Sequence, residues 1–174
     1  MFDAARPMRF SLVRNRSPAY LMHVSGEFTV PAPRAAVFSA LRDANSFVRF
    51  VEGVSDLKEI DPTHYQAMFE TKIAYIKFRF AVTVEITRIE EPAEIEARIE
   101  GTPLGVVGRL TAKSLTRLED AGEATKVTYS VESTLAGKLG SIGQPVLRAK
   151  ARDMEKEFAK RLCAAFAPAP SEVR

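Results

Sequence analysis

The chain has little of the chemistry that most metal and catalytic sites require. Among its 174 residues there is one cysteine, Cys163, and there are two histidines, His23 and His64. One cysteine excludes an internal disulfide, and a zinc site needs about four ligands, usually in closely spaced pairs. No spacing pairs either histidine with Cys163 as base and nucleophile. We therefore expect no metal site and no catalytic residues.

Long apolar runs and a large net charge are also missing. No stretch approaches the ~18 consecutive apolar residues that cross a bilayer, and no apolar run with a cleavage site follows the N-terminus. The net charge is only +3, with basic and acidic residues interspersed through most of the sequence, so nucleic acid is not an expected partner. The single cysteine fits a reducing compartment. These features predict a cytoplasmic protein without a membrane-spanning helix or signal peptide.

The N-terminal segment 1–21 is the exception, since its charged residues are almost all arginines. Its one acidic residue is Asp3, and its basic residues are Arg6, Arg9, Arg14 and Arg16. A basic arm of this kind could contact an anionic surface or a partner. Alternatively, the segment is a disordered extension, or Met22 is the true start. We favour the second interpretation, because short terminal extensions are usually disordered.

Most of the sequence alternates between apolar and polar residues with a period of two, which is typical of strands with one buried face. The strands expected from this pattern cover residues 21–30, 65–73, 76–86, 94–100, 109–113 and 126–135. Turns are marked by Asp61-Pro62, Glu91-Pro92 and Asp120-Ala121-Gly122. One-sided alternation indicates an antiparallel sheet with one face in solvent.

Two short helices are expected after the first strand, and one long helix near the end of the chain. Pro33 suits the first turn of one short helix, and the other covers residues 45–50. The long helix covers residues 145–166 and ends before Pro168. Its apolar stripe consists of Leu147, Ala151, Met154, Phe158, Leu162 and Phe166.

This order of elements predicts an α+β helix-grip, or START-like, fold. A curved antiparallel sheet of about six to seven strands would wrap around the long helix, since the concave face of the sheet is the large apolar surface that can cover its stripe. The domain would span residues 22–166, between the N-terminal extension and a short tail at residues 167–174.

A bent sheet wrapped on one helix leaves space between them, and this space is the natural ligand site. We expect the cavity to be lined by inward-facing residues of the strands, the last loop and the long helix. They are Tyr65, Phe69, Thr71, Ile73, Ile76, Phe78, Phe80, Val82, Leu110, Ser114, Tyr129, Ser133, Leu135, Leu139, Ile142, Leu147, Met154 and Phe158. The polar members of this set either hydrogen-bond within the core or orient the polar end of an apolar ligand.

Carboxylates do not fall on the inward phase of the strands. Glu94, Glu96 and Glu100 alternate with apolar residues and are expected to point into solvent. If hydroxyls are the polar groups that face the cavity, the cavity lacks a general acid or base, which argues against catalysis.

The loop 137–143 contains several glycines, so its backbone is conformationally permissive. Two interpretations remain open. The glycines could serve a loop that needs positive φ, or the loop could be a hinge at the cavity mouth with Leu139 and Ile142 as a lid. In the second case Lys138, Leu139 and Ile142 would contact a membrane or a partner.

Several short motifs resemble those of one protein family. They are GEFTVPAP (26–33), VFSALRD (37–43), EGV (52–54), YQA (65–67), KI (72–73), IKFRF (76–80) and GKLGSIG (137–143). Together they resemble the CoxG subunit family of carbon monoxide dehydrogenase, which belongs to the START-like/SRPBCC superfamily. The resemblance extends over about residues 22–166.

The resemblance implies a non-catalytic accessory protein of a carbon monoxide dehydrogenase-type molybdenum hydroxylase. It also implies binding of a hydrophobic small molecule, a quinone or lipid, without a covalently bound cofactor, and recruitment as a peripheral protein to the inner face of the membrane. Many members carry a long C-terminal tail with a membrane-binding end, whereas a short tail follows Phe166 here. The alternatives are a polyketide cyclase/dehydratase-like enzyme that acts on a hydrophobic substrate, and an interaction protein with a filled core.

Overall fold

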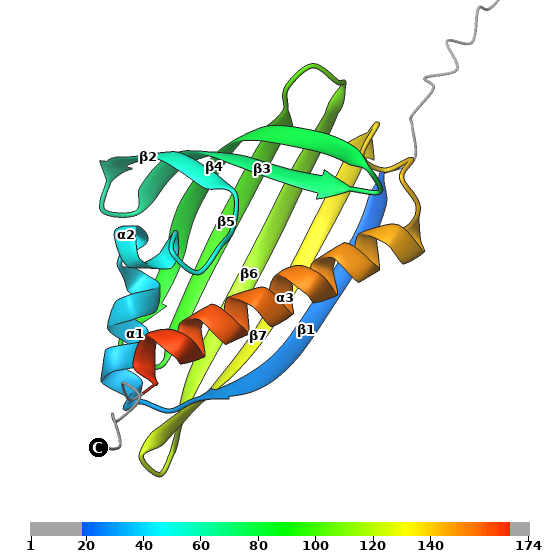
Figure 1. The fold of residues 1–174 in the computed structure, drawn as a ribbon. Helices are drawn as coiled ribbons and strands as arrows, with labels where there is room; N and C mark the ends of the chain where they lie inside the picture. The colour runs from blue at the N-terminus through cyan, green and yellow to red at the C-terminus, as the bar shows by residue number, and fades with distance from the viewer. Residues whose placement is uncertain (1–18, 168–174) are drawn as a thin grey trace, which may run out of the picture.

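The computed structural model describes residues 19–167, which form one antiparallel sheet curved around a long helix (Figure 1). Within these residues the sheet has seven strands in the order β1-β7-β6-β5-β4-β3-β2. They are β1 (Tyr20–Val30), β2 (Val54–Asp61), β3 (His64–Ile73), β4 (Ile76–Glu90), β5 (Glu94–Pro103), β6 (Gly108–Ala121) and β7 (Ala124–Gly137). The predicted α+β helix-grip fold is confirmed. The N-terminal arginines lie outside the described residues.

The helices are α1 (Arg34–Arg42), α2 (Ala44–Phe47) and α3 (Gln144–Phe166). Figure 1 shows α3 crossing the concave face of the sheet, with α1 and α2 at one end of it. Asp43 separates the two short helices because its backbone is extended, and its carboxylate accepts a hydrogen bond of 3.1 Å from the Asn45 backbone nitrogen. Pro145 lies in the first turn of α3, as its missing N–H allows.

The sequence pattern does not predict β2, and the geometry of this strand explains why. Its pairing with β3 shifts register twice, between Ser55 and Lys58 and between Glu59 and Asp61. Asp56 has a positive φ of 53°. These irregularities remove the period of two that identifies the other strands. β2 is also an edge strand, and an irregular edge resists pairing with a second chain.

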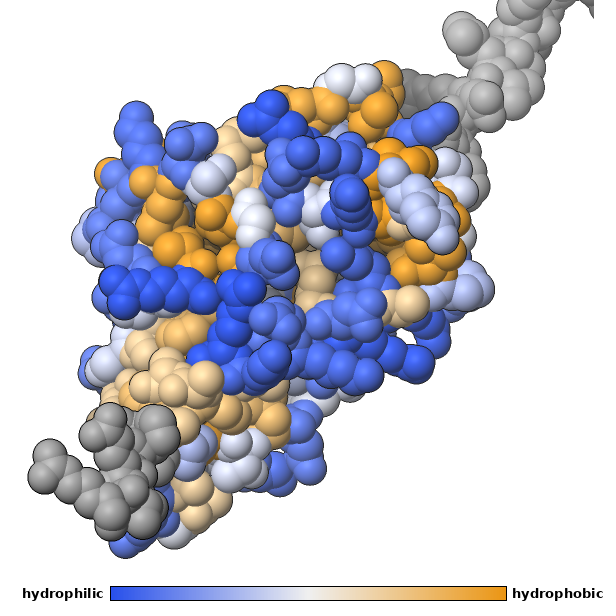
Figure 2. All heavy atoms as spheres, in the orientation of Figure 1, coloured by the Kyte–Doolittle hydropathy of each residue, from blue (hydrophilic) through white to orange (hydrophobic). Residues whose placement is uncertain are grey.

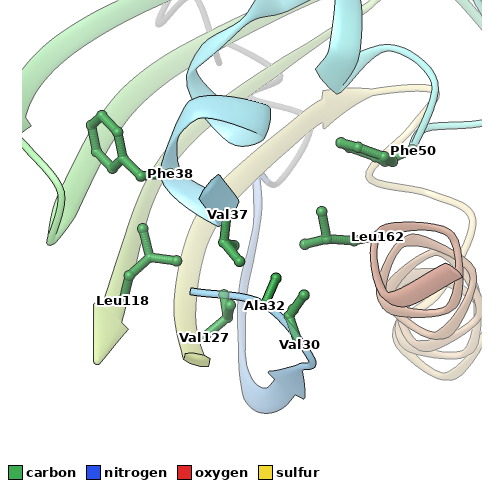
Figure 3. Packing of buried hydrophobic residues seen from close by; sticks show 8 residues of the cluster. All are labelled: Val30, Ala32, Val37, Phe38, Phe50, Leu118, Val127 and Leu162. Atoms are coloured by element: carbon green, nitrogen blue, oxygen red, sulfur yellow. The ribbon is translucent and has the colours of Figure 1, made fainter. Parts of the chain in front are cut away.

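Two buried clusters lie under opposite ends of α3. The α1-end core, shown in Figure 3, consists of Val30, Ala32, Val37, Phe38, Phe50, Leu118, Val127 and Leu162. The hairpin-end core consists of Ile73, Phe78, Phe80, Leu135, Leu139 and Leu147. On α3 itself, Leu147 and Leu162 are separated by about 22 Å of helix at 1.5 Å per residue. The helix is therefore held to the sheet near both of its ends.

Candidate functional site

The middle of the concave face lies between the two cores and is only half buried. Val24 pairs with Val131 across β1 and β7, and Val84 pairs with Ile99 across β4 and β5. All of these side chains keep partial exposure. Residues at the centre of a sheet beneath a closely packed helix are normally buried. We call this accessible apolar surface, defined by these residues, the concave belt.

Figure 2 shows this side of the molecule in space-filling form. Polar side chains cover α3, and apolar side chains are visible between them and the polar side chains over β2. Two surface grooves are distinct from the concave belt. One, of about 460 Å³, lies beside α1 and is lined by residues that include Phe38, Arg42 and Ile89. The other, of about 560 Å³, lies between the β3–β4 turn and the start of α3.

The predicted cavity residues differ in exposure. The buried ones are Ile73, Phe78, Phe80, Ser133, Leu135, Leu139 and Leu147. The half-buried ones are Tyr65, Phe69, Thr71, Val82, Leu110, Ser114, Tyr129, Ile142 and Phe158. Ile76 and Met154 are 49% and 38% exposed. A ligand could reach the half-buried group without opening either core, and its contact with a ligand stays a prediction.

Helix α3 turns a carboxylate toward the sheet where a methionine was expected. Met154 is 38% exposed, whereas Glu155 Oε1 lies 2.8 Å from the position that a Cβ on Gly26 would occupy. Leu147, Ala151 and Glu155 have helical spacing as good as that of the predicted stripe, but hydrophobicity alone favoured Met154. The expectation that only hydroxyls face the interior is therefore wrong.

Glu155 meets Tyr129 of β7 opposite Gly26 of β1. Gly26 and Tyr129 are register partners, and a Cβ at residue 26 would collide with the Tyr129 hydroxyl. That hydroxyl is shielded from solvent and makes no well-aligned hydrogen bond within residues 19–167. Burial, and then the neighbouring Glu155 carboxylate, raise the pKa of Tyr129. The absent side chain of Gly26 is what allows the tyrosine and the glutamate to share this crossing point.

Two of the other inward hydroxyls are used within the fold. Ser133 Oγ donates to the Met22 carbonyl over 3.3 Å. The Tyr65 hydroxyl donates to the Pro62 carbonyl over 2.9 Å and accepts from the Arg42 guanidinium over 3.1 Å. For Ser133 and Tyr65, the interpretation as hydrogen-bonding core residues is therefore confirmed.

The loop 137–143 belongs to the hairpin-end core. Leu139 is fully buried, and Ile142 packs against the same cluster. The expectation of an exposed lid residue at Leu139 is therefore wrong. Gly137 and Gly143 have φ values of 66° and 104°, a region that favours glycine. The alternative interpretation, a loop that needs positive φ, is confirmed.

The sequence model of the CoxG subunit family of carbon monoxide dehydrogenase matches residues 26–166. This chain belongs to the CoxG family. The match runs from the middle of β1 to the last residue of α3, so the concave belt and both cores lie within the CoxG domain.

Solved structures share the fold of this CoxG domain. A conserved protein from Geobacillus kaustophilus is 23% identical, with a TM-score of 0.77 over 83% of this chain and 95% of that one. The Zhui aromatase/cyclase from Streptomyces sp. R1128 is 14% identical, with a TM-score of 0.63 over 84% and 93%. A protein from Mycobacterium smegmatis is 12% identical, with a TM-score of 0.61 over 84% and 91%. Identities this low establish the fold alone. No curated protein matches the chain.

The scarce reactive side chains of the CoxG domain occupy structural positions. His64 Nδ1 lies 2.9 Å from Asp61 Oδ1 in the β2–β3 turn. Cys163 Sγ lies 3.3 Å from the Thr29 carbonyl oxygen, and burial raises the pKa of its thiol, which lowers its thiolate fraction. Among residues 19–167 no group of His, Cys, Asp and Glu is arranged to hold a metal ion. In the same range, no helix is long and apolar enough to span a bilayer.

Glu94 departs from the predicted row of solvated carboxylates on the outer face of the sheet. It is only 8% exposed and lies between two guanidinium groups, 2.9 Å from Arg88 and 3.2 Å from Arg117. Glu96 and Glu100 follow the prediction more closely and pair with basic residues of β6. The expectation was wrong for Glu94 because residues two strands apart in the sheet cover it.

Proposed function

We propose that this CoxG-family protein binds a hydrophobic small molecule, a quinone or a lipid, on the concave face of its sheet. Family membership supports an accessory role alongside a carbon monoxide dehydrogenase. In the proposed role the protein carries its ligand for a molybdenum hydroxylase, without catalytic residues of its own, and helps to bring that enzyme to the membrane.

The concave belt is the observation that carries the ligand-binding proposal. Its residues are apolar and lie between two cores that hold α3 near both ends, yet they remain accessible. Apolar surface removed from water contributes about 25 cal/mol per Å². A flat or chain-like apolar molecule placed under the helix would cover the belt and gain this energy without disturbing either core.

Ligand-induced thermal stabilisation tests the proposal. A short-chain quinone analogue should raise the melting temperature, since a ligand at about 100 times its Kd stabilises the folded state by about 2.7 kcal/mol. Ile99→Glu, in the concave belt, should abolish the rise, and Ile89→Glu, outside the belt, should preserve it. Mass spectrometry of organic extracts from the purified protein should identify a co-purified ligand. No shift at analogue concentrations far above micromolar would contradict the proposal.

A second candidate function is polyketide cyclase-like catalysis, and Glu155 is the observation that favours it. A carboxylate beside Tyr129 supplies a group able to accept a proton from a substrate on the concave face. The candidates separate experimentally. An enzyme would turn over a poly-β-ketone analogue and lose this activity in Glu155→Gln, whereas a carrier would keep its ligand-induced thermal shift in that variant. Absence of turnover by the unmodified protein would exclude the second candidate.

A further inference from the structure

Exposed apolar side chains gather at the end of the sheet that carries the β3–β4 turn, the β5–β6 turn and the start of α3. Tyr75 is fully exposed and Val107 is 87% exposed. The other exposed apolar residues there are Leu21, Ile76, Leu104, Val106 and Val146. Figure 1 shows these segments at one end of the molecule, and Figure 2 shows apolar side chains over the same end. We call this surface the apolar end. Gathered apolar exposure of this kind marks an interaction site.

Backbone contacts join these segments into one surface. The Leu104 nitrogen donates to the Arg79 carbonyl over 2.8 Å, which places the β5–β6 turn beside the β3–β4 hairpin. The Lys138 nitrogen donates to the Val107 carbonyl over 2.9 Å, which joins the loop before α3 to the same turn. Tyr75 and the first residues of α3 line one groove of about 560 Å³.

The β3–β4 turn holds its exposed tyrosine in a strained backbone conformation. Ala74 and Tyr75 have φ values of 49° and 71°, and two-residue turns of this kind prefer asparagine and glycine. The tyrosine therefore combines an unfavourable backbone with a ring in water. Such an outlier points to a function for the side chain rather than to stability of the turn.

Basic residues surround the apolar end. Lys72, Lys138, Arg148 and Lys150 take part in none of the ion pairs formed within residues 19–167, whereas nearby Lys77 and Arg79 share Glu70. Asp153 is the acidic residue that lines the groove beside Lys72 and Lys150. Unpaired cations around apolar protrusions are complementary to anionic lipid headgroups over an acyl interior.

We infer that the apolar end docks on the surface of an anionic lipid bilayer. The Tyr75 and Val107 side chains enter the boundary between headgroups and acyl chains, and the lysines contact the headgroups. The inference rests on the proposed function, because it names the membrane-facing surface of the proposed carrier and the class of lipid that this surface recognises.

Co-sedimentation with vesicles tests the inference on the full chain. Vesicles of phosphatidylcholine and phosphatidylglycerol in equal parts should bind the protein, and vesicles of phosphatidylcholine alone should bind it about tenfold more weakly or worse. Tyr75→Asn combined with Val107→Ser should weaken binding to the mixed vesicles by about tenfold. Asparagine suits the positive φ at position 75, so the fold should be retained.

The opposite end of the sheet supplies a matched control. Ile60→Ser combined with Ile89→Ser removes two side chains that are 50% and 37% exposed and should leave vesicle binding unchanged. Lys72→Gln combined with Lys138→Gln should weaken binding to the mixed vesicles alone. The inference is overturned if the unmodified protein ignores anionic vesicles, if the Tyr75/Val107 variant binds as before, or if the control loses as much.

Two further measurements separate other outcomes. Sedimentation velocity would reveal a dimer that the Tyr75/Val107 variant dissolves, and this surface would then belong to a second copy of the chain and not to a bilayer. The thermal shift with the quinone analogue, measured without vesicles, reports the concave face alone and should persist in the Tyr75/Val107 variant. A missing shift in the unmodified protein refutes the proposed function and leaves the vesicle result to be judged by itself.

Discussion

The two ends of the sheet expose different chemistry at their turns. At the α1 end the turns carry acidic residues, including Asp61, Glu91 and Asp120, and Arg34 lies 3.5 Å from the Asp120 carboxylate. At the apolar end the turns carry Tyr75 and Leu104 to Val107, with basic residues around them. Helices α1 and α2 close the first end, and no helix closes the tips of the second within the described chain. The same hairpin architecture therefore serves closure at one end and contact at the other.

The largest expected effect tests whether both ends have a real core. Leu139→Ala and Leu162→Ala should each lower the free energy of unfolding by about 2–5 kcal/mol, because both side chains are fully buried. Urea denaturation measures both. A loss below about 0.5 kcal/mol for Leu139→Ala would be typical of a surface residue, and the hairpin end would then be a mobile lid instead of a core.

The crossing point between the two ends should tolerate substitution poorly. Gly26→Ala should cost roughly 1–3 kcal/mol, because the added Cβ meets the Tyr129 hydroxyl and Glu155. Tyr129→Phe removes the hydroxyl and should recover part of this loss in the double variant. Strictly additive free energies of unfolding would show that the three residues are not coupled.

Alkaline titration sharpens the same point with a smaller effect. The folded pKa of Tyr129 is raised above the ordinary value of 10.0, so the folded state favours the neutral hydroxyl. Its contribution to stability is present below pH 10 and is lost as pH rises toward the folded pKa. Tyr129→Phe should reduce the alkaline loss of stability, and Tyr75→Phe, at an exposed site, should not. Equal alkaline profiles for the two variants would contradict the burial of the Tyr129 hydroxyl.

The smallest expected effect lies in the β2–β3 turn at the α1 end. His64 first, and then the Thr63 backbone nitrogen, lower the pKa of Asp61 from 3.8 to about 2. A lowered folded pKa stabilises the fold above pH 3.8, and this contribution is lost as pH falls through about 2. His64→Ala should raise the pKa of Asp61 toward 3.8 in an NMR titration, with little change in overall stability because the turn is exposed. An unchanged pKa would assign the effect to the turn backbone.

Periodicity along the sequence predicted the regular strands and α3, because each of them buries one face against one partner. It failed where tertiary geometry decides between equivalent patterns. Met154 and Glu155 are adjacent and both continue a helical stripe, so the choice depends on Gly26, which lies far away in sequence. The burial of Glu94 likewise depends on arginines of β4 and β6.

The candidate site was predictable in its composition but not in its accessibility. Inward-facing residues could be named from the period of two, but the pattern cannot distinguish Leu139 in a core from Phe69 beside the concave belt. That difference depends on where α3 touches the sheet, which loop geometry sets. Tyr75 was missed for the opposite reason, since a turn residue has no phase, although an aromatic between two strands is itself a signal that could have been used.

The pairing of β1 with β7 has a consequence for synthesis of the chain. Met22 and Ser133 are register partners separated by 111 residues, so β1 leaves the ribosome long before its partner exists. Strands β2 to β6 pair with sequence neighbours and can form in turn. Throughout that time β1 offers unpaired backbone groups and an apolar face, and non-local pairings of this kind are slow and prone to aggregation. The emerging chain should therefore be most dependent on chaperones between translation of residue 30 and residue 137.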